Sequence, residues 1–196
     1  MIPKLVQSLP NSLTNFGIGA LAQSLRAVKN RKHPLSELLW NAKTTTMTTE
    51  VLFYHLMSQS LERVLPTLLE KSLERGWRAV VEFGSEERRD ALDAALWEYS
   101  DASFLPHSAA RDGTEAEQPI WLTCGQDRPN GAHIRFLVDR ARPAELELYE
   151  RVVLMFNGHD EEALRDARED WKQLKSAGHA VTYWQQNERG RWEKKA

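Results

Sequence analysis

Cysteine is nearly absent from this chain, which has one residue, Cys124, among 196. One cysteine cannot form an internal disulfide, and the histidines show no metal-ligand spacing. The histidines are scattered singly at His33, His55, His107, His133, His159 and His179. Cys124 closes an apolar stretch, which is typical of a buried thiol. We therefore expect no metal site and a reducing, cytoplasmic location.

Long apolar runs and the common catalytic motifs are missing as well. No run approaches the roughly 20 residues needed to cross a bilayer, so we expect no membrane partner. The sequence has no Gly-x-x-x-x-Gly-Lys-Ser/Thr loop, no Gly-x-Gly-x-x-Gly turn and no Gly-x-Ser-x-Gly elbow. Its carboxylates do not form an obvious catalytic pair. These absences predict a protein that is not an enzyme, with no catalytic residue and no cofactor.

Charge is distributed unevenly along the chain. The formal net charge is −2; the first 46 residues contribute six cations and one acid, or +5, so the remainder carries −7. An acidic domain is a poor general binder of nucleic acid, because that affinity comes largely from neutralising phosphates. Any contact with DNA is therefore expected to be indirect.

The composition divides the chain into three parts. Residues 1–46, rich in Ser, Asn, Thr and Leu, resemble a transit peptide, or else translation starts at Met47. We expect this segment to be a poorly ordered extension or a mis-annotated start. Residues 47–186 have the pattern of an α/β domain, and residues 187–196 are a charged tail.

From Met47 onward, strand-like and helix-like segments alternate. Extended segments are expected at 50–56, 78–83, 103–107, 120–124, 134–138, 151–156 and 180–184. Helices are expected at 59–76, 86–99, 145–149 and 160–178, and 108–118 reads as a polar loop. Apolar spacing supports the first helix, and Gly76 is a plausible terminator for it. The order predicts an α/β fold: a mostly parallel sheet with helices on both faces, Rossmann-like but without a nucleotide-binding motif.

The last predicted helix sorts its charges by face. At about 100° per residue, four cations share one arc, with Leu164 and Trp171 at its edge. These cations are Arg165, Arg168, Lys172 and Lys175. The acids on the far side are Glu162, Asp166, Glu169 and Asp170, and the buried stripe is Ala163, Ala167, Leu174 and Ala177. Neighbouring like charges cost about 0.2–0.5 kcal/mol per pair, so the strip favours an anionic ligand; a solvated face is an equally weighted alternative.

Seven tryptophans are many for this length. Trp77, Trp121 and Trp184 lie in or beside strands and are expected in the core. Trp97 and Trp171 lie on helices, where we slightly favour a role in a protein interface, because exposed Trp beside Arg is a common anchor.

Several segments after Met47 resemble one family, the chi subunit of bacterial DNA polymerase III holoenzyme. They are Phe53-Tyr-His-Leu56, Leu92-Asp-Ala-Ala-Leu-Trp97 followed by Ser103-Phe-Leu-Pro-His107, and a last helix in which Trp171 follows Arg168 by three before Lys175-Ser-Ala-Gly178. The resemblance covers about three quarters of the chain and rests on order and spacing. The typical start of the family aligns near Met47.

The resemblance implies a non-catalytic accessory subunit of the clamp loader. Such a subunit binds the acidic C-terminal tail of single-stranded-DNA-binding protein and also binds the psi subunit; a helicase is left open as a further partner. The residues implied for the tail are Trp97, Leu164, Arg165, Arg168, Trp171, Lys172 and Lys175. The residues implied for psi are Phe104, Pro106 and His107. The position of Leu164 can carry a basic residue in relatives, and this chain lacks that charge there. Arg165, the next residue, is expected to supply it.

Two other functions remain open from the sequence. One is a degenerate nucleotide-binding enzyme of the same topology. The other is direct binding of single-stranded DNA through the basic strip and the tryptophans.

Overall fold

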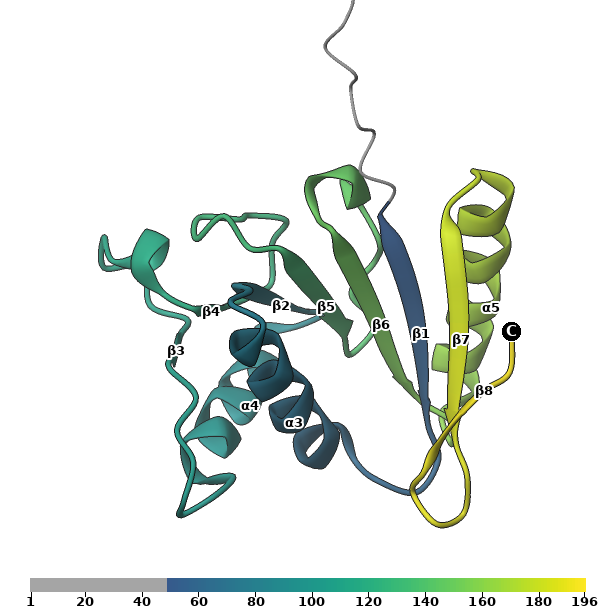
Figure 1. Ribbon diagram of the computed structural model, residues 1–196, viewed down its shortest axis with the longest axis horizontal. Coiled ribbons are helices and arrows are strands. Elements are labelled where there is room, and N and C mark those ends of the chain that lie inside the picture. The colour runs from purple at the N-terminus through teal and green to yellow at the C-terminus, as the bar shows by residue number, and fades with distance from the viewer. Residues whose placement is uncertain (1–48) are drawn as a thin grey trace, which may run out of the picture. The chain divides into compact units, whose positions relative to one another are not determined.

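The computed structural model describes residues 49–196, so the expectation for residues 1–46 lies outside the described part of the chain. Within that part, one sheet of eight strands carries the fold (Figure 1). The strands are β1 (Glu50–Leu56), β2 (Ala79–Phe83), β3 (His107–Ser108), β4 (Ile120–Thr123), β5 (Ile134–Val138), β6 (Arg151–Asn157), β7 (Ala180–Gln186) and β8 (Trp192–Lys194). The α-helices are α3 (Leu61–Glu74), α4 (Glu86–Glu98) and α5 (Glu161–Ser176), and the 3₁₀ turns are η1 (Glu115–Glu117) and η2 (Leu146–Leu148).

The strand order is β3-β4-β2-β5-β6-β1-β7-β8. Every neighbouring pair is parallel except β7 with β8, which is antiparallel. β1 lies between β6 and β7, with Phe53 opposite Leu154 on one side and Tyr183 on the other. The predicted α/β class with a mostly parallel sheet is therefore confirmed.

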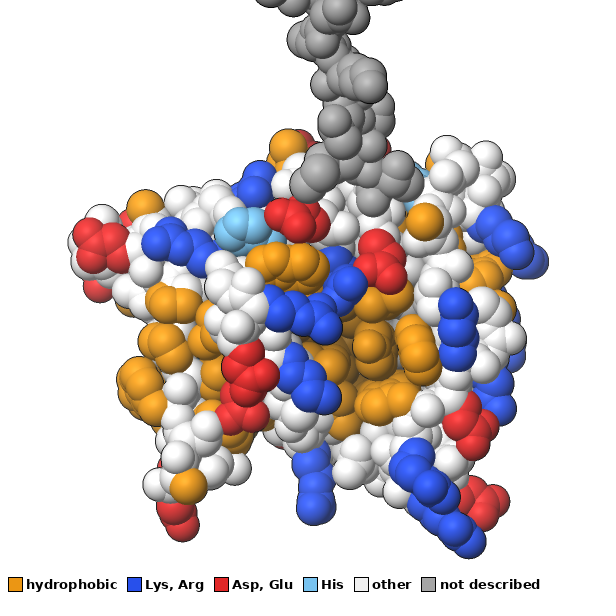
Figure 2. Space-filling model, viewed as in Figure 1, with side chains coloured by type: hydrophobic (Ala, Val, Ile, Leu, Met, Phe, Trp, Pro, Cys, Tyr) orange, Lys and Arg blue, Asp and Glu red, His pale blue; other side chains and the backbone are white. Residues whose placement is uncertain are grey.

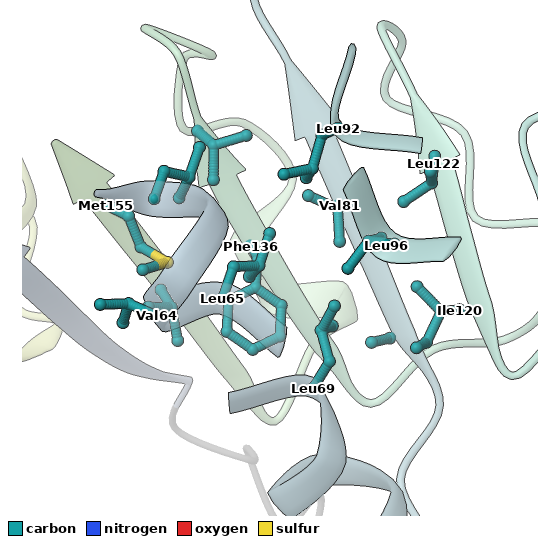
Figure 3. Packing of buried hydrophobic residues seen from close by; sticks show 14 of the residues in the cluster. Val64, Leu65, Leu69, Val81, Leu92, Leu96, Ile120, Leu122, Phe136 and Met155 are labelled. Atoms are coloured by element: carbon teal, nitrogen blue, oxygen red, sulfur yellow. The ribbon is translucent and has the colours of Figure 1, made fainter. Parts of the chain in front are cut away.

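The helices cover opposite faces of this sheet because successive strand side chains point to opposite sides. On β1, Leu52 belongs to the first core, on the face of the sheet that carries α3 and α4, whereas Val51 and Phe53 belong to the second core, under α5. Figure 3 shows the first core, in which Leu65 and Leu69 of α3 and Leu96 of α4 meet the strands. Burial of each such large apolar side chain contributes about 1.5–3 kcal/mol.

Most element boundaries agree with the expected ones. β1 and β5 coincide with the expected segments, and α3, α4 and α5 differ by at most two residues at each end. Gly76 and Gly178 follow the ends of α3 and α5 with φ of +74° and +89°. Glycine adopts this left-handed backbone at the end of a helix without the cost that a Cβ adds.

Three segments differ from expectation. Only His107 of the segment 103–107 lies in a strand, and the expected helix at 145–149 is the 3₁₀ turn η2. Residues 187–196, expected as a charged tail, contain β8, in which Trp192 opposes Gln186. The charged residues of this segment led to the expectation of a tail. Edge strands commonly carry charged side chains, which discourage further pairing, so a charged composition does not exclude a strand.

One ion pair is buried inside the sheet. Arg135 of β5 is fully buried and bonds Glu82 of β2, which is 6% exposed. Arg135 also donates to the carbonyl of Ala144 over 3.0 Å, and its guanidinium lies 5.4 Å from the centre of the Tyr149 ring. Burial lowers the pKa of Arg135. A sequence pattern of alternating apolar residues gives no sign of this pair.

None of the helices within residues 49–196 combines the length and apolar character needed to span a membrane.

Candidate functional site

The last helix, α5, is the element on which the sequence placed most of its candidate residues. Asp160 caps it by accepting bonds from the backbone N–H groups of Glu162 and Ala163 over 2.9 and 3.1 Å. Its underside buries Ala163, Ala167 and Leu174, as expected. Ala177, expected in the same stripe, is exposed because it is the C-cap, where the helix leaves the sheet.

The acidic side of α5 is only partly as expected. Glu162 and Glu169 are exposed, but Asp166 and Asp170 are each only 8% exposed. Arg140 Nε lies 3.0 Å from Asp166, and Arg142 reaches Asp166 at 3.2 Å and Asp170 at 3.5 Å.

The two aspartates respond differently to this surrounding. Burial opposes ionisation of Asp166, yet Arg140 and Arg142 hold its pKa below the usual range. Burial outweighs Arg142 at Asp170 and raises its pKa. This flank of α5 is therefore neutralised by the loop after β5.

The opposite flank of α5 faces β7 and keeps its positive charge. Arg168 and Lys175 are exposed there, Lys172 is exposed further around the helix next to Arg165, and within residues 49–196 none of these cations forms an ion pair. Trp171 is half-buried, and Lys175 Nζ lies 5.6 Å from the centre of its ring. Leu164 is half-buried and Arg165 is exposed. Six of the seven residues expected to bind an acidic tail thus lie together on one helix.

Strand β7 supplies site residues that the sequence analysis missed. Trp171 packs edge-on against Phe53 at 5.3 Å and against Tyr183 at 5.8 Å between ring centres. Tyr183 and Val181 of β7 are half-buried on this side of the sheet. Val181 and Tyr183 alternate with other residues along a strand that directly follows the basic helix. This spacing could have indicated that both side chains lie on the same face of the sheet as α5. The result is an apolar, aromatic strip bordered by cations.

Arg168 precedes Trp171 by three residues on α5, and so lies about 60° from it around the helix, beside this strip. The Tyr183 hydroxyl forms a 2.9 Å hydrogen bond with Nδ1 of His55. Burial raises the pKa of Tyr183, and the nearby Arg168 acts against that rise. Burial lowers the pKa of His55, and the charges of His159 and Arg168 lower it further. Guanidinium and ammonium groups form strong hydrogen bonds with carboxylates, so the arrangement suits a carboxylate attached to an apolar group.

Trp97 does not lie near this strip, which corrects the expectation from the sequence. It belongs to α4, on the face of the sheet opposite α5. Trp97 is 59% exposed and Phe104 is 66% exposed, and their ring centres lie 5.8 Å apart. The two side chains form one exposed aromatic pair, whose members the sequence had assigned to different partners.

The other two residues expected to face psi are less exposed. Pro106 is half-buried. His107 is buried, with Nδ1 2.6 Å from the carbonyl of Leu105 and its ring 4.8 Å from that of Trp97. The buried His107 ring therefore packs against Trp97, and its side chain presents no surface to a binding partner.

A cavity of about 570 Å³ lies beyond the carboxyl ends of β1, β5 and β6, where parallel α/β sheets usually bind ligands. Five carboxylates line it against two guanidiniums, those of Arg88 and Arg140. The carboxylates are Glu62, Asp139, Asp160, Asp166 and Asp170. The first turns of α3, α4 and α5 also carry acids. Arginines pair with four of these five carboxylates, namely Glu62, Asp139, Asp166 and Asp170, so among the described residues the cavity presents no cluster of free cations for the phosphates of a nucleotide.

The side chains that commonly bind metal ions are those of His, Cys, Asp and Glu. Within residues 49–196, His, Cys, Asp and Glu nowhere form a group of three or more that could hold a metal ion. Cys124 is half-buried at the end of β4, and burial raises the pKa of its thiol.

Comparisons with known proteins bear on the same region of the chain. Probable DNA polymerase III subunit chi of Rickettsia prowazekii is 26% identical over 102 residues, which are 50% of this chain and 62% of that protein. DNA polymerase III subunit chi of Pseudomonas aeruginosa is 30% identical over 105 residues, which are 53% of this chain and 70% of that protein.

The model of one protein family, described as DNA polymerase III chi subunit, HolC, matches residues 47–182. The match begins three residues before β1 and ends within β7, and so includes α5, Trp97 and Phe104. Because it spans well over half of the sequence, the chain belongs to the DNA polymerase III chi subunit family.

Proposed function

We propose that this chain is a non-catalytic, cytoplasmic accessory subunit of the replicative clamp loader, and that it binds the acidic C-terminal tail of single-stranded-DNA-binding protein. The observation that carries this proposal is the positively charged flank of α5 beside the half-exposed rings of Trp171 and Tyr183. An acidic tail ending in an apolar residue offers carboxylates for Arg168 and Lys175 and a side chain for the aromatic strip. DNA then meets this protein only through the single-stranded-DNA-binding protein.

The surrounding charge supports a peptide over DNA. The part of the chain after residue 46 carries −7, so it repels a long DNA backbone more strongly than a short acidic tail that contacts only the cations of α5. Arg168 is close enough to Tyr183 and His55 for its charge to act on the pKa of both groups, which supports its role at the polar edge of the proposed site. Leu164 offers further apolar surface at the start of the helix.

A titration tests this proposal. A fluorescent peptide with the sequence of the acidic tail is expected to bind the full chain with micromolar affinity at low salt. Raising the salt concentration should weaken binding, because exposed charges are screened over about 10 Å at 0.1 M ionic strength. A control peptide lacking the terminal apolar residue should bind more weakly at every salt concentration. Failure of the tail peptide to bind at low salt would contradict the proposal.

The psi subunit is proposed to bind the exposed pair formed by Trp97 and Phe104, with Pro106 beside it. Large exposed aromatic side chains are frequent anchors of protein interfaces. A helicase partner is proposed for the same surface, because Trp97 and Phe104 are the two exposed large aromatic side chains among residues 49–196.

The double substitution Trp97→Ala/Phe104→Ala is expected to weaken psi binding by about 100-fold, since each anchor typically contributes 1–2 kcal/mol or more. The side chains are mostly exposed, so the thermal midpoint of unfolding should change little. Calorimetric titration with psi measures the first effect, and circular dichroism measures the second. Tail-peptide affinity serves as the control and should be unchanged, because α5 lies on the other face of the sheet.

Two alternatives are separated by inexpensive measurements. A nucleotide that raised the melting temperature would support a degenerate nucleotide-binding enzyme, which the acidic cavity at the strand ends disfavours. Oligonucleotide alone binding as tightly as its complex with single-stranded-DNA-binding protein would support direct DNA binding instead of the adaptor role.

A further inference from the structure

The face of the sheet that carries α3 and α4 is covered over only part of its width. These two helices lie against β2, β4 and β6. Among residues 49–196, no helix covers β7 and β8 on this side, since α5 lies on the other face (Figure 1). Parallel sheets are normally covered on both faces, because their strands carry apolar residues on both. The uncovered area is therefore a place where another element can pack.

The uncovered area has an apolar, largely aromatic floor. Leu52 and Tyr54 of β1, Trp184 of β7 and Trp192 of β8 line a groove of about 450 Å³. Tyr54 and Trp192 pack edge to face, with ring centres 4.6 Å apart. Figure 2 shows this hollow as a patch of hydrophobic side chains between α3 and β7, with Lys and Arg at its border.

The border along α3 is a second stripe of cations. Arg63 and Lys71 of α3 and Arg75, the residue that caps its end, line the groove at intervals of eight and four residues, which places them within an arc of about 120°. At 1.5 Å per residue, the stripe is about 18 Å long. Within residues 49–196 none of the three forms an ion pair, and no acidic residue lines the groove. Arg151 is a fourth cation, bonded to Glu50 at 2.5 Å.

A row of unpaired cations beside an apolar floor selects its occupant by charge and shape. We propose that this groove binds an amphipathic α-helix of a partner protein, with an acidic stripe against α3 and an apolar face on β1, β7 and β8. A helix packed beside α3 completes the helical layer and neutralises Arg63, Lys71 and Arg75 along three turns. This site is separate from the strip on α5, which lies on the opposite face of the sheet.

Other occupants fit the observations less well. Single-stranded nucleic acid stacks its bases on open aromatic faces, but Tyr54 and Trp192 pack against each other, and Trp77 lies under Arg75 and Arg151 at 5.7 and 5.1 Å. A symmetric pair of this chain would bring two cationic stripes together, which costs energy at a self-complementary interface.

The test uses the full chain and a designed probe, a labelled amphipathic peptide of about 16 residues, which spans about 24 Å as a helix. One face carries Glu at every fourth position and the other carries Leu; a matched peptide carries Lys in place of Glu. Fluorescence anisotropy measures binding to the parent chain and to two triple variants with the same change in charge. The first is Arg63→Glu/Lys71→Glu/Arg75→Glu on α3, and the second is Arg165→Glu/Lys172→Glu/Lys175→Glu on α5.

The α3 variant is expected to bind the acidic peptide at least about tenfold more weakly, because attraction becomes repulsion along the stripe. The α5 variant should remain within about twofold of the parent. Trp192→Ala, which leaves every cation in place, should weaken binding by about fivefold through loss of the apolar floor. If the α3 triple variant fails to fold by circular dichroism, Lys71→Ala/Arg75→Ala takes its place.

Several results would overturn the proposal. They are equal losses in the two triple variants, unchanged binding in the folded α3 variant, and equal affinity for the Lys peptide. Oligothymidylate binding that exceeds peptide binding and disappears in the α3 variant would assign the groove to nucleic acid instead. The acidic-tail peptide separates this site from the α5 site, since its binding should be lost only in the α5 variant.

Discussion

Arg168→Glu is expected to weaken binding of the acidic tail peptide by about 10- to 100-fold. A hydrogen bond between charged groups contributes about 1.5–3 kcal/mol, and each 1.4 kcal/mol corresponds to a factor of ten in affinity. Arg168 lies about 60° around the helix from Trp171, next to the aromatic strip of Trp171 and Tyr183. Reversing its charge also places a carboxylate where the carboxylates of the tail must bind.

Arg165→Glu is the matched control for this substitution. It makes the same change of charge on the same helix, but Arg165 lies about 120° from Trp171, away from β7. We expect it to weaken tail binding by no more than about threefold, through long-range repulsion. Calorimetric titration at constant salt measures both variants. Equal losses would show that the helix attracts the tail by its total charge and that no defined site at β7 exists.

Glu82→Leu is expected to destabilise the fold by about 3–5 kcal/mol, the largest effect on stability that we predict. The substitution leaves Arg135 fully buried without its carboxylate, and an uncompensated charge in the interior is costly. The remaining acceptor at the carbonyl of Ala144 and the ring of Tyr149 offset only part of that cost. Urea unfolding followed by circular dichroism measures the loss.

The double variant Glu82→Leu/Arg135→Met distinguishes charge from packing. Replacing both members of a buried ion pair by apolar residues of similar size is often neutral or stabilising. The double variant should therefore recover most of the stability lost in Glu82→Leu. A double variant less stable than Glu82→Leu would mean that Arg135 supports the sheet mainly through its packing and its other hydrogen bonds. Tail-peptide affinity should be unaffected in both folded variants.

The part of the candidate site that lies on α5 was predictable from the sequence. The positions of Arg165, Arg168, Lys172 and Lys175 on α5 follow from a fixed rotation per residue, which the sequence alone supplies. The contributions of Tyr183 and Val181 depend on which strand lies beside α5, and that depends on sheet order. The expectation that Trp97 lies near the cations of α5 was wrong for the same reason. The sequence does not show that α4 and α5 cover opposite faces of the sheet.

Buried charges were the second kind of feature hidden from the sequence. Asp166 and Asp170 were expected to lie with Glu162 and Glu169 on the side of α5 far from the cations, because the helical rotation per residue groups all four there. Burial separates them, since Arg140 and Arg142 in the loop after β5 neutralise the first two. The ion pair of Arg135 with Glu82 likewise joins two strands that are far apart in sequence.

The sequence by itself determined the elements and their alternation, since apolar spacing and glycines after helix ends act over a few residues. That alternation also determined the α/β class. Only the tertiary structure decided the strand order, the strand in the C-terminal segment and the pairing of Trp97 with Phe104. These features depend on contacts between distant segments, which form because the sheet and its two helical layers bury apolar surface together.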